Sequence, residues 1–145
     1  MASTDTDLER YRSAYAALVD SRKTLLLATR NGEQPEVSYA PFIRDADGFY
    51  IFISDLAQHS RNLQLCAKAG VMLIEDEEGC QNLFARQRAS FDCTVSQVAP
   101  QEVRYTRLLE RMEQQLGNVV GVLRNLADFK LFVLQPTRAF CRGVW

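Results

Sequence analysis

The spacing of apolar residues changes several times along the chain, and each change marks a predicted element. Leu8, Tyr11, Tyr15, Leu18 and Val19 share one helical face, which predicts a helix that ends near Val19. Thr4 or Asp5 is its expected N-cap. Beyond it the apolar runs are short and turn residues separate them, which predicts strands over 24–29, 37–43, 49–54, 71–74, 84–95, 129–134 and 139–145.

Two further helices and two tight turns complete this pattern. A short helix is predicted over 59–66, and a long apolar stripe predicts another over 105–123. Gly117 and Gly121 weaken the long helix, so one kinked helix and two separate helices both stay open. Asn31-Gly32 and Asp45–Gly48 are hairpin signals. Consecutive strands with helices set apart predict one α+β domain over 1–145, with an antiparallel sheet closed as a barrel.

Composition narrows the function classes. The formal net charge is −1, which argues against nucleic acid and membrane surfaces as partners. No apolar run reaches the ~20 residues of a membrane helix, and the acidic start has no apolar segment typical of a signal peptide, so a cytoplasmic protein is expected. Cys66, Cys80, Cys93 and Cys141 lack zinc-site spacing and are expected to be reduced thiols, with Cys93 in the core.

The clearest chemical signal lies where the 49–54 strand gives way to the short helix. His59, the only histidine, is followed there by Ser60 and Arg61. A helix N-terminus offers free N–H groups, and an arginine adds a two-pronged grip on phosphate or carboxylate. Three interpretations of His59 stay open: a heme-iron ligand, a hydrogen-bond donor to an anion, or a solvent-facing helix-start residue. Arg61 is either an anion contact or a surface charge.

A second basic pair lies on the predicted 84–95 strand. Arg86 and Arg88 are two residues apart and therefore share one strand face, as an anion site or as two exposed charges. No Ser-His-Asp triad can be argued around the one histidine, and no metal-ligand cluster is visible, so no catalytic residue is assigned. Any difficult chemistry would belong to a bound cofactor.

Several motifs in this order resemble the pyridoxamine-phosphate-oxidase-like split β-barrels, in particular their heme-utilisation branch. The matching stretches are Lys23–Thr29, Val37–Phe42, His59–Leu63, Met72–Glu77, Leu83–Arg88, Phe91-Asp92, Asp128–Phe132 and Gln135-Pro136. The resemblance implies an FMN-binding split barrel of six or seven antiparallel strands with peripheral helices. It also implies a homodimer with its ligand sites in clefts between the subunits.

The same resemblance implies which residues hold the cofactor. Flavin-binding members grip the FMN phosphate at the helix start and from the long fifth strand, and line the flavin ring with the second strand. The predicted cofactor-binding set is therefore Ser38, Tyr39, Ala40, Ser54, His59, Ser60, Arg61, Arg86, Gln87 and Arg88. If heme is bound instead, His59 is the predicted metal ligand.

Two departures from the family shape the functional expectation. Ser38 stands where flavin-dependent members usually carry an arginine, and 141–145 lacks the C-terminal signature of true pyridoxamine-phosphate oxidases. Heme-degrading relatives often take an axial histidine from a C-terminal extension, which this sequence does not contain. An FMN-dependent oxidoreductase is accordingly the first expectation. A heme-binding or heme-degrading protein of iron utilisation is the alternative, and a non-catalytic dimeric binding module is the third.

Overall fold

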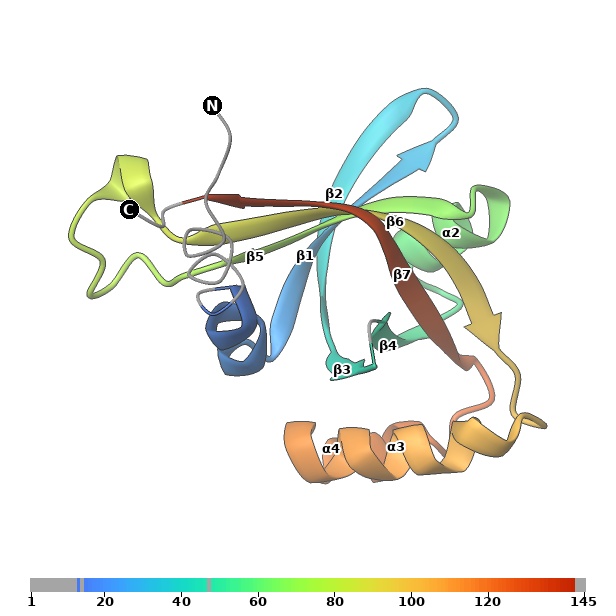
Figure 1. Ribbon diagram of the computed structural model, residues 1–145. Coiled ribbons are helices and arrows are strands. Elements are labelled where there is room, and N and C mark those ends of the chain that lie inside the picture. Colours follow the sequence, from blue (N-terminus) through green and yellow to red (C-terminus); the bar gives the residue numbers. More distant parts are fainter. Residues whose placement is uncertain (1–12, 14, 47, 143–145) are drawn as a thin grey trace.

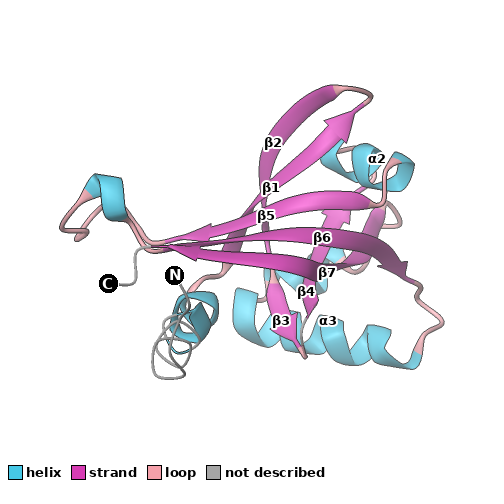
Figure 2. Cartoon of the chain, turned by 45° about the horizontal axis from the view of Figure 1, so that its top comes forward, coloured by secondary structure: helices cyan, strands magenta, loops and turns pink. Residues whose placement is uncertain are grey.

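The computed structural model describes residues 13, 15–46 and 48–142, and a single antiparallel sheet dominates them (Figures 1 and 2). The sheet has seven strands in the order β2-β1-β5-β6-β7-β4-β3. The strands are β1 Thr24–Asn31, β2 Gln34–Pro41, β3 Ile43–Asp45, β4 Gly48–Ser54, β5 Lys68–Ile74, β6 Arg88–Val98 and β7 Phe129–Arg142. The predicted α+β fold is confirmed, whereas the single-domain boundary at 1–145 stays a prediction.

The sheet curls, and its two edge strands follow one another directly in the chain. β2 and β3 lie at opposite ends of the strand order, yet only Phe42 separates them in the chain. One continuous strand over 37–43 was therefore the wrong prediction. Pro41 has no N–H to continue a ladder, and the N–H of Phe42 donates to the Lys23 carbonyl at 3.0 Å instead. This break lets the chain pass from one edge to the other and gives the split half-barrel.

Local turn chemistry explains the β1–β2 hairpin. Asn31 pairs with Gln34, so Gly32 and Glu33 form the turn at the predicted place. Gly32 has φ +62°, which a type II′ turn requires at its first central position and which glycine adopts without strain.

The long strands differ from their predicted bounds. The region predicted to open the fifth strand forms η1, Leu83–Ala85, because the side chain of Asn82 accepts a hydrogen bond from the Phe84 N–H at 3.0 Å. The two strands predicted over 129–134 and 139–145 are one strand, β7. Pro136 does not end β7. The pairing of β7 with β4 reaches only to Leu134, so β7 has β6 as its one partner at Pro136, and the β6–β7 register shifts next to this residue.

Helices lie at three places around the sheet. The first helix is described at 13 and 15–21, while its predicted N-caps lie outside the described residues. α2, Gln58–Leu65, agrees with its prediction within one residue. The long apolar stripe forms two helices, α3 Val103–Leu116 and α4 Val119–Leu123, that break at Gly117 with φ +111°. None of the described helices has the length and hydropathy needed to cross a bilayer.

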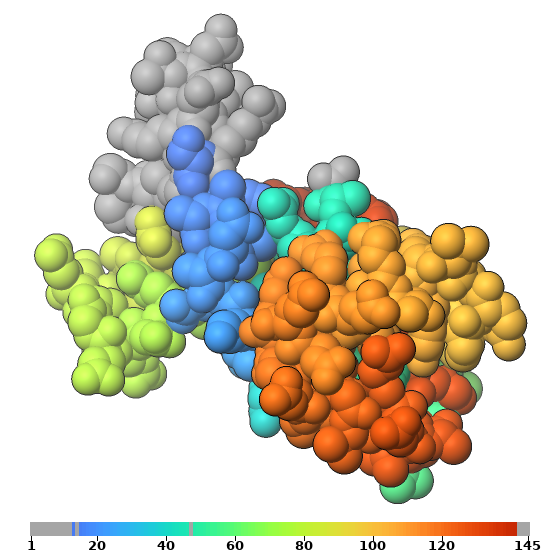
Figure 3. Space-filling model, turned by 90° about the horizontal axis from the view of Figure 1, so that it is seen from below, coloured from blue at the N-terminus to red at the C-terminus, as the bar shows by residue number. Residues whose placement is uncertain are grey.

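Two hydrophobic cores hold these elements together. The first fills the barrel, where the rings of Phe42, Phe49 and Phe91 form a chain of edge-to-face contacts. The second lies between the sheet and α3–α4, which cover it from below in Figures 1 and 3. Cys93 belongs to the first core, as predicted, and burial raises the pKa of its thiol to about 12.

Candidate functional site

A buried amide fixes α2 against the inner face of the hairpin. Asn62 Nδ2 donates to Thr29 Oγ1 at 2.9 Å and to Glu36 Oε1 at 2.7 Å, and its Oδ1 accepts from Gln58 Nε2 at 2.8 Å. Both N–H groups of the amide are thereby satisfied inside the protein. Leu63 on the same side enters the barrel core. The orientation of the helix start is therefore set by its own buried contacts.

At that helix start His59 meets Ser38 of β2. Ser38 Oγ lies 2.8 Å from His59 Nδ1, and the imidazole is about half-buried. Burial lowers the pKa of His59 below its ordinary value, which favours the neutral ring near pH 7. A neutral imidazole with one nitrogen engaged keeps the second nitrogen for a proton, a hydrogen bond or a metal.

The two residues after His59 take opposite orientations. Ser60 is fully buried, and its hydroxyl accepts a hydrogen bond from Gln64 Nε2 at 3.3 Å. Arg61 is exposed and donates to the Leu56 carbonyl at 3.3 Å and to Gln58 Oε1 at 2.9 Å. Arg61 therefore has a surface from which it can reach an anion, whereas Ser60 reaches one only if the helix start moves.

Ser54, the remaining predicted residue near α2, belongs to a polar network at the end of β4. Its hydroxyl donates to Asp128 Oδ2 at 2.7 Å and accepts from the Leu56 N–H at 3.1 Å. Next to it, Lys130 Nζ pairs with Asp55 at 2.7 Å, and this contact holds the pKa of the Asp55 carboxyl below its usual value. The Ser54 hydroxyl is thus engaged by its own chain.

The predicted basic residues of the fifth strand fasten the loop between β5 and β6. The Arg86 guanidinium donates through Nε to the Glu75 carbonyl at 3.1 Å and through a second nitrogen to the same oxygen. The Gln87 N–H donates to Glu75 Oε1 at 2.6 Å, and Arg88 donates to the Arg86 carbonyl at 2.9 Å. The guanidinium groups of Arg86 and Arg88 are therefore partly engaged by backbone carbonyls, which leaves fewer of their N–H groups for an anion.

The register places these two groups of residues far apart in one chain. Ser38 pairs with Leu27, Leu27 with Val71, and Val71 with Phe91, which spans three strand spacings, and Arg88 lies three residues farther along β6. At ~4.8 Å per spacing and ~3.3 Å per residue, the backbones of Ser38 and Arg88 are roughly 17 Å apart. Figures 1 and 2 show α2 and the β5–β6 loop at opposite ends of the sheet.

The three predicted residues of β2 are also divided between two faces. Ser38 pairs with buried Leu27 and Ala40 is buried, so both face the barrel interior, whereas Tyr39 is exposed on the outer face. Tyr39 belongs to a cross-strand row on that face: Tyr39, Leu26, Met72, Ser90 and Phe140. A shallow apolar groove of about 300 Å³ runs beside this row.

Sequence reasoning missed the residues that position the candidate site. Asn62, Glu36 and Asp128 hold the helix start or its flank, but their partners lie on other strands, so no local pattern could identify them. Within the described part of the chain, no three His, Cys, Asp or Glu residues gather as a metal site.

Comparisons with known proteins agree with this geometry. A family profile described as pyridoxamine 5'-phosphate oxidase matches residues 12–142. The heme oxygenase HutZ of Vibrio cholerae serotype O1 is 40% identical over 124 residues, which are 84% of this chain and 70% of that protein. A crystal structure of HutZ, described as the heme storage protein of Vibrio cholerae, has a TM-score of 0.87 at 36% identity and covers 93% of this chain and 96% of its own.

A third likeness, to Campylobacter jejuni ChuZ, has a TM-score of 0.82 at 25% identity and covers 95% of this chain but 56% of the other. These findings correct the expected function and cofactor. The first expectation, an FMN-dependent oxidoreductase, is wrong, because the protein that is 40% identical is named for heme. The helix-start pattern around His59 does not by itself identify the ligand, because one fold can host sites for different ligands.

Proposed function

The chain belongs to the pyridoxamine 5'-phosphate oxidase family, and from this premise we propose that it is a heme-binding protein of heme utilisation. One observation carries the proposal: the 40% identity to a heme oxygenase extends over 84% of the chain. A location in the cytoplasm, the expectation from the sequence, is part of the proposal.

The described residues fit heme in their chemistry. Heme needs a ligand for its iron and cations for its propionates. His59 provides a neutral, half-buried imidazole, and Arg61 carries an exposed guanidinium two residues later on the same helix start. We propose that His59 holds the iron and that Arg61 faces a propionate.

Ser38 would decide which nitrogen of His59 meets the iron. When Nδ1 carries the proton and donates it to Ser38 Oγ across 2.8 Å, the lone pair remains on Nε2. Histidines that bind metals commonly have such a partner on their other nitrogen, which orients the ring. Bound heme would supply an iron centre at which dioxygen and external electrons act on the porphyrin.

We further propose that two copies associate and share the ligand cleft. The outer face of β1, β2 and β5 exposes Leu26, Val37 and Tyr39, and a sheet with apolar residues on both faces needs a cover. Association would also bring Arg86 and Arg88 of one copy, at the end of its β5–β6 loop and the start of β6, toward a site that lies too far from them within one chain. The cleft would then contain residues from both subunits.

Hemin titration of the purified protein tests the proposal. We expect a Soret shift with a histidine-type spectrum, which His59→Ala abolishes because the described chain offers no other imidazole. Ser38→Ala keeps the imidazole but loses its partner, and about tenfold weaker binding is expected, within the ~10–100-fold range of such partners. A histidine-type spectrum that persists in His59→Ala would refute ligation by His59.

Oxidative breakdown of heme is a second candidate activity, because the relative with 40% identity is named a heme oxygenase. The loaded protein would be mixed with ascorbate and dioxygen while the Soret band and iron release are followed. Loss of the band with release of iron supports breakdown, whereas a stable band supports storage. A wild-type protein without any Soret shift would leave the non-catalytic binding module as the better description.

A further inference from the structure

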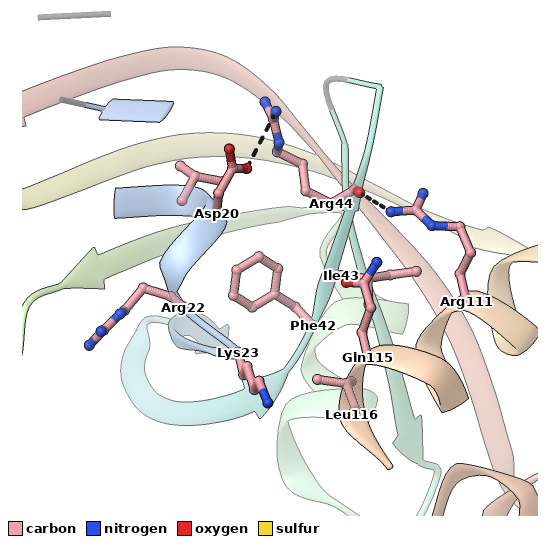
Figure 4. A pocket seen from close by; sticks show the side chains of 10 residues that line it. Asp20, Arg22, Lys23, Phe42, Ile43, Arg44, Arg111, Gln115 and Leu116 are labelled. Carbon is pink, nitrogen blue, oxygen red and sulfur yellow. Dashed lines mark hydrogen bonds and ion pairs between the residues drawn. The ribbon is translucent and has the colours of Figure 1, made fainter. Parts of the chain in front are cut away.

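A cavity outside the candidate heme site lies between the first helix, β3 and α3. Its volume is about 500 Å³, and its walls come from 19–23, the β2–β3 corner and one side of α3. In Figure 3 these segments meet on the lower face as blue, teal and orange surfaces. Figure 4 shows Phe42 at the centre of this space, with charged side chains around it.

Positive charge dominates the lining. Arg22, Lys23, Arg44 and Arg111 stand against one carboxylate, Asp20. Three of these cations have partners: Arg44 lies 3.7 Å from Asp20, Arg111 is 2.7 Å from Asp45, and Arg22 is 2.9 Å from Asp76. The guanidinium of Arg22 also points away from the cavity in Figure 4.

Lys23 is different from these three. Its ammonium has no ion pair and no hydrogen bond with any residue in the described ranges. Lys23 is exposed and leads directly into β1, so its backbone is held by the sheet while its charge stays available. A cation without a carboxylate partner at a cavity wall favours an anion there.

A second, smaller cavity adjoins the first. It has a volume of about 230 Å³, and its walls are mostly apolar side chains of β4, α3 and α4, among them Phe52, Met112 and Val120, with Thr24 and Pro41 from the strand ends. Lys23 and Leu116 line both cavities. Lys23 thus stands at the junction between an apolar space and a basic one.

We propose that this pair of cavities binds a small amphipathic carboxylate, of the class of medium-chain fatty acids. The apolar chain occupies the smaller cavity under α3–α4, and the carboxylate meets Lys23 at the junction. At ~30 Å³ for a group of the size of water, the smaller cavity holds about seven or eight non-hydrogen atoms. That length corresponds to an eight-carbon chain.

The walls disfavour other anions. Inorganic phosphate or a nucleotide would leave the apolar cavity empty, and a neutral lipid would leave Lys23 without a partner. The site lies at α3 and not at α2, so it does not rest on the proposed heme function, and its failure would leave that proposal intact.

Calorimetric titration with octanoate tests the proposal on the intact protein. Lys23→Gln is expected to weaken octanoate binding about two- to fivefold, the scale of an exposed ion pair. Lys68→Gln removes the same charge on β5, outside both cavities, and should bind like wild type. Equal affinity of Lys23→Gln and wild type would overturn the role of Lys23.

The apolar part is tested on α4. Val119 lines the small cavity and is more than half exposed, so Val119→Trp can fill the space without a buried clash and should abolish octanoate binding. Val122→Trp, on the same helix outside the cavity, is its matched control, and equal thermal midpoints of the two variants exclude misfolding.

Two probes separate the contributions of chain and charge. Octanol is expected to bind wild type and Lys23→Gln with the same weak affinity, and acetate is expected to show no binding. Octanoate binding that survives in Val119→Trp would place the ligand elsewhere, and no octanoate binding by wild type would refute the site.

Discussion

The two faces of the hairpin β1–β2 both carry large apolar residues, but in opposite environments. On the inner face Leu27 is 0% exposed, whereas on the outer face Leu26 is 42%, Tyr39 63% and Val37 79% exposed. An antiparallel strand with one wet face normally alternates apolar and polar residues. Here the outer face carries large apolar residues although it is wet, whereas the inner face combines leucines with the polar residues Thr29, Glu36 and Ser38, so what distinguishes the two faces is their cover.

The inner face obtains its cover from its own chain. The curl of the sheet and the start of α2 enclose it, and the Asn62 amide joins α2 to β1 and β2 through two donated hydrogen bonds. No helix of the described chain packs over Leu26 and Tyr39, which line or adjoin an open groove. The face that the fold completes is a core, and the face that it leaves open is the proposed place for a second copy.

The largest effect is expected from truncating the covered face. Leu27→Ala should lower the free energy of unfolding by about 2–5 kcal/mol, because a buried leucine leaves a cavity. Leu26→Ala, one residue earlier and on the other face, should cost less than about 1 kcal/mol. Urea unfolding at one protein concentration compares them. An equal loss would show that the outer face is buried just as deeply in the assembled protein.

The next effect concerns the polar contact that closes the inner face. Asn62→Ala leaves Thr29 and Glu36 without their buried donor and should cost about 1–3 kcal/mol. Leu65→Ala, on the exposed side of the same helix, is the control and should stay within ~0.5 kcal/mol. If both variants unfold alike, α2 is not held by the amide.

A charge placed on the open face should act on association and not on folding. Tyr39→Glu is expected to weaken pairing of two copies by about tenfold or more, because a carboxylate would lose its water in an apolar contact. Gln34→Glu adds the same charge at the hairpin end and is the control. Light scattering across a dilution series measures both. A wild-type protein that is monomeric at tens of micromolar would remove the outer face as an interface.

The smallest expected effect is the pH dependence of the free energy of unfolding that comes from His59 at the inner face. Burial lowers its pKa in the folded protein, so the unfolded chain, whose histidine titrates near its ordinary ~6.5, binds the proton more readily. Stability from this group is complete above about pH 6.5 and is lost as the pH falls toward the lowered folded pKa.

The variant His59→Gln has no group that titrates at this position. The free energy of unfolding of wild type minus that of His59→Gln, measured from pH 7.5 to 5, therefore gives the contribution of His59. A wild-type protein that gains stability relative to His59→Gln on acidification would contradict the direction of the shift. Heme affinity should fall over the same range, since a protonated imidazole cannot bind iron.

Features that depend on neighbours in the chain were predictable. The hairpin near Asn31 and Gly32, the start of α2, and the break of the long apolar stripe near Gly117 all appear where their local signals lie. The predictions of one strand over 37–43 and of a sixth strand that ends before Pro136 were wrong, because these features depend on strand order and not on neighbours in the chain. Pro41 and Pro136 look alike in sequence, but one ends a ladder at a sheet corner while the other lies where β7 has a single partner.

The candidate site shows the same limit. The sequence identified His59 and Arg61 from helix-start chemistry, but it could not show that Ser38 lies beside the imidazole or that Ser60 points inward. Its grouping of Arg86 and Arg88 with them in a cleft between subunits stays a prediction, since the register separates the two groups by roughly 17 Å within one chain.

By itself, the sequence determined the period of each element, the turn residues, the family and the supply of candidate groups, because these depend on spacing and composition. Only the tertiary structure decided which face of β1 and β2 is covered, which polar groups are already engaged, and where Lys23 lies beside an apolar cavity without an ion-pair partner among the described residues. Those outcomes depend on strand order and curl, which bring residues dozens of positions apart into contact. No local pattern contains that information.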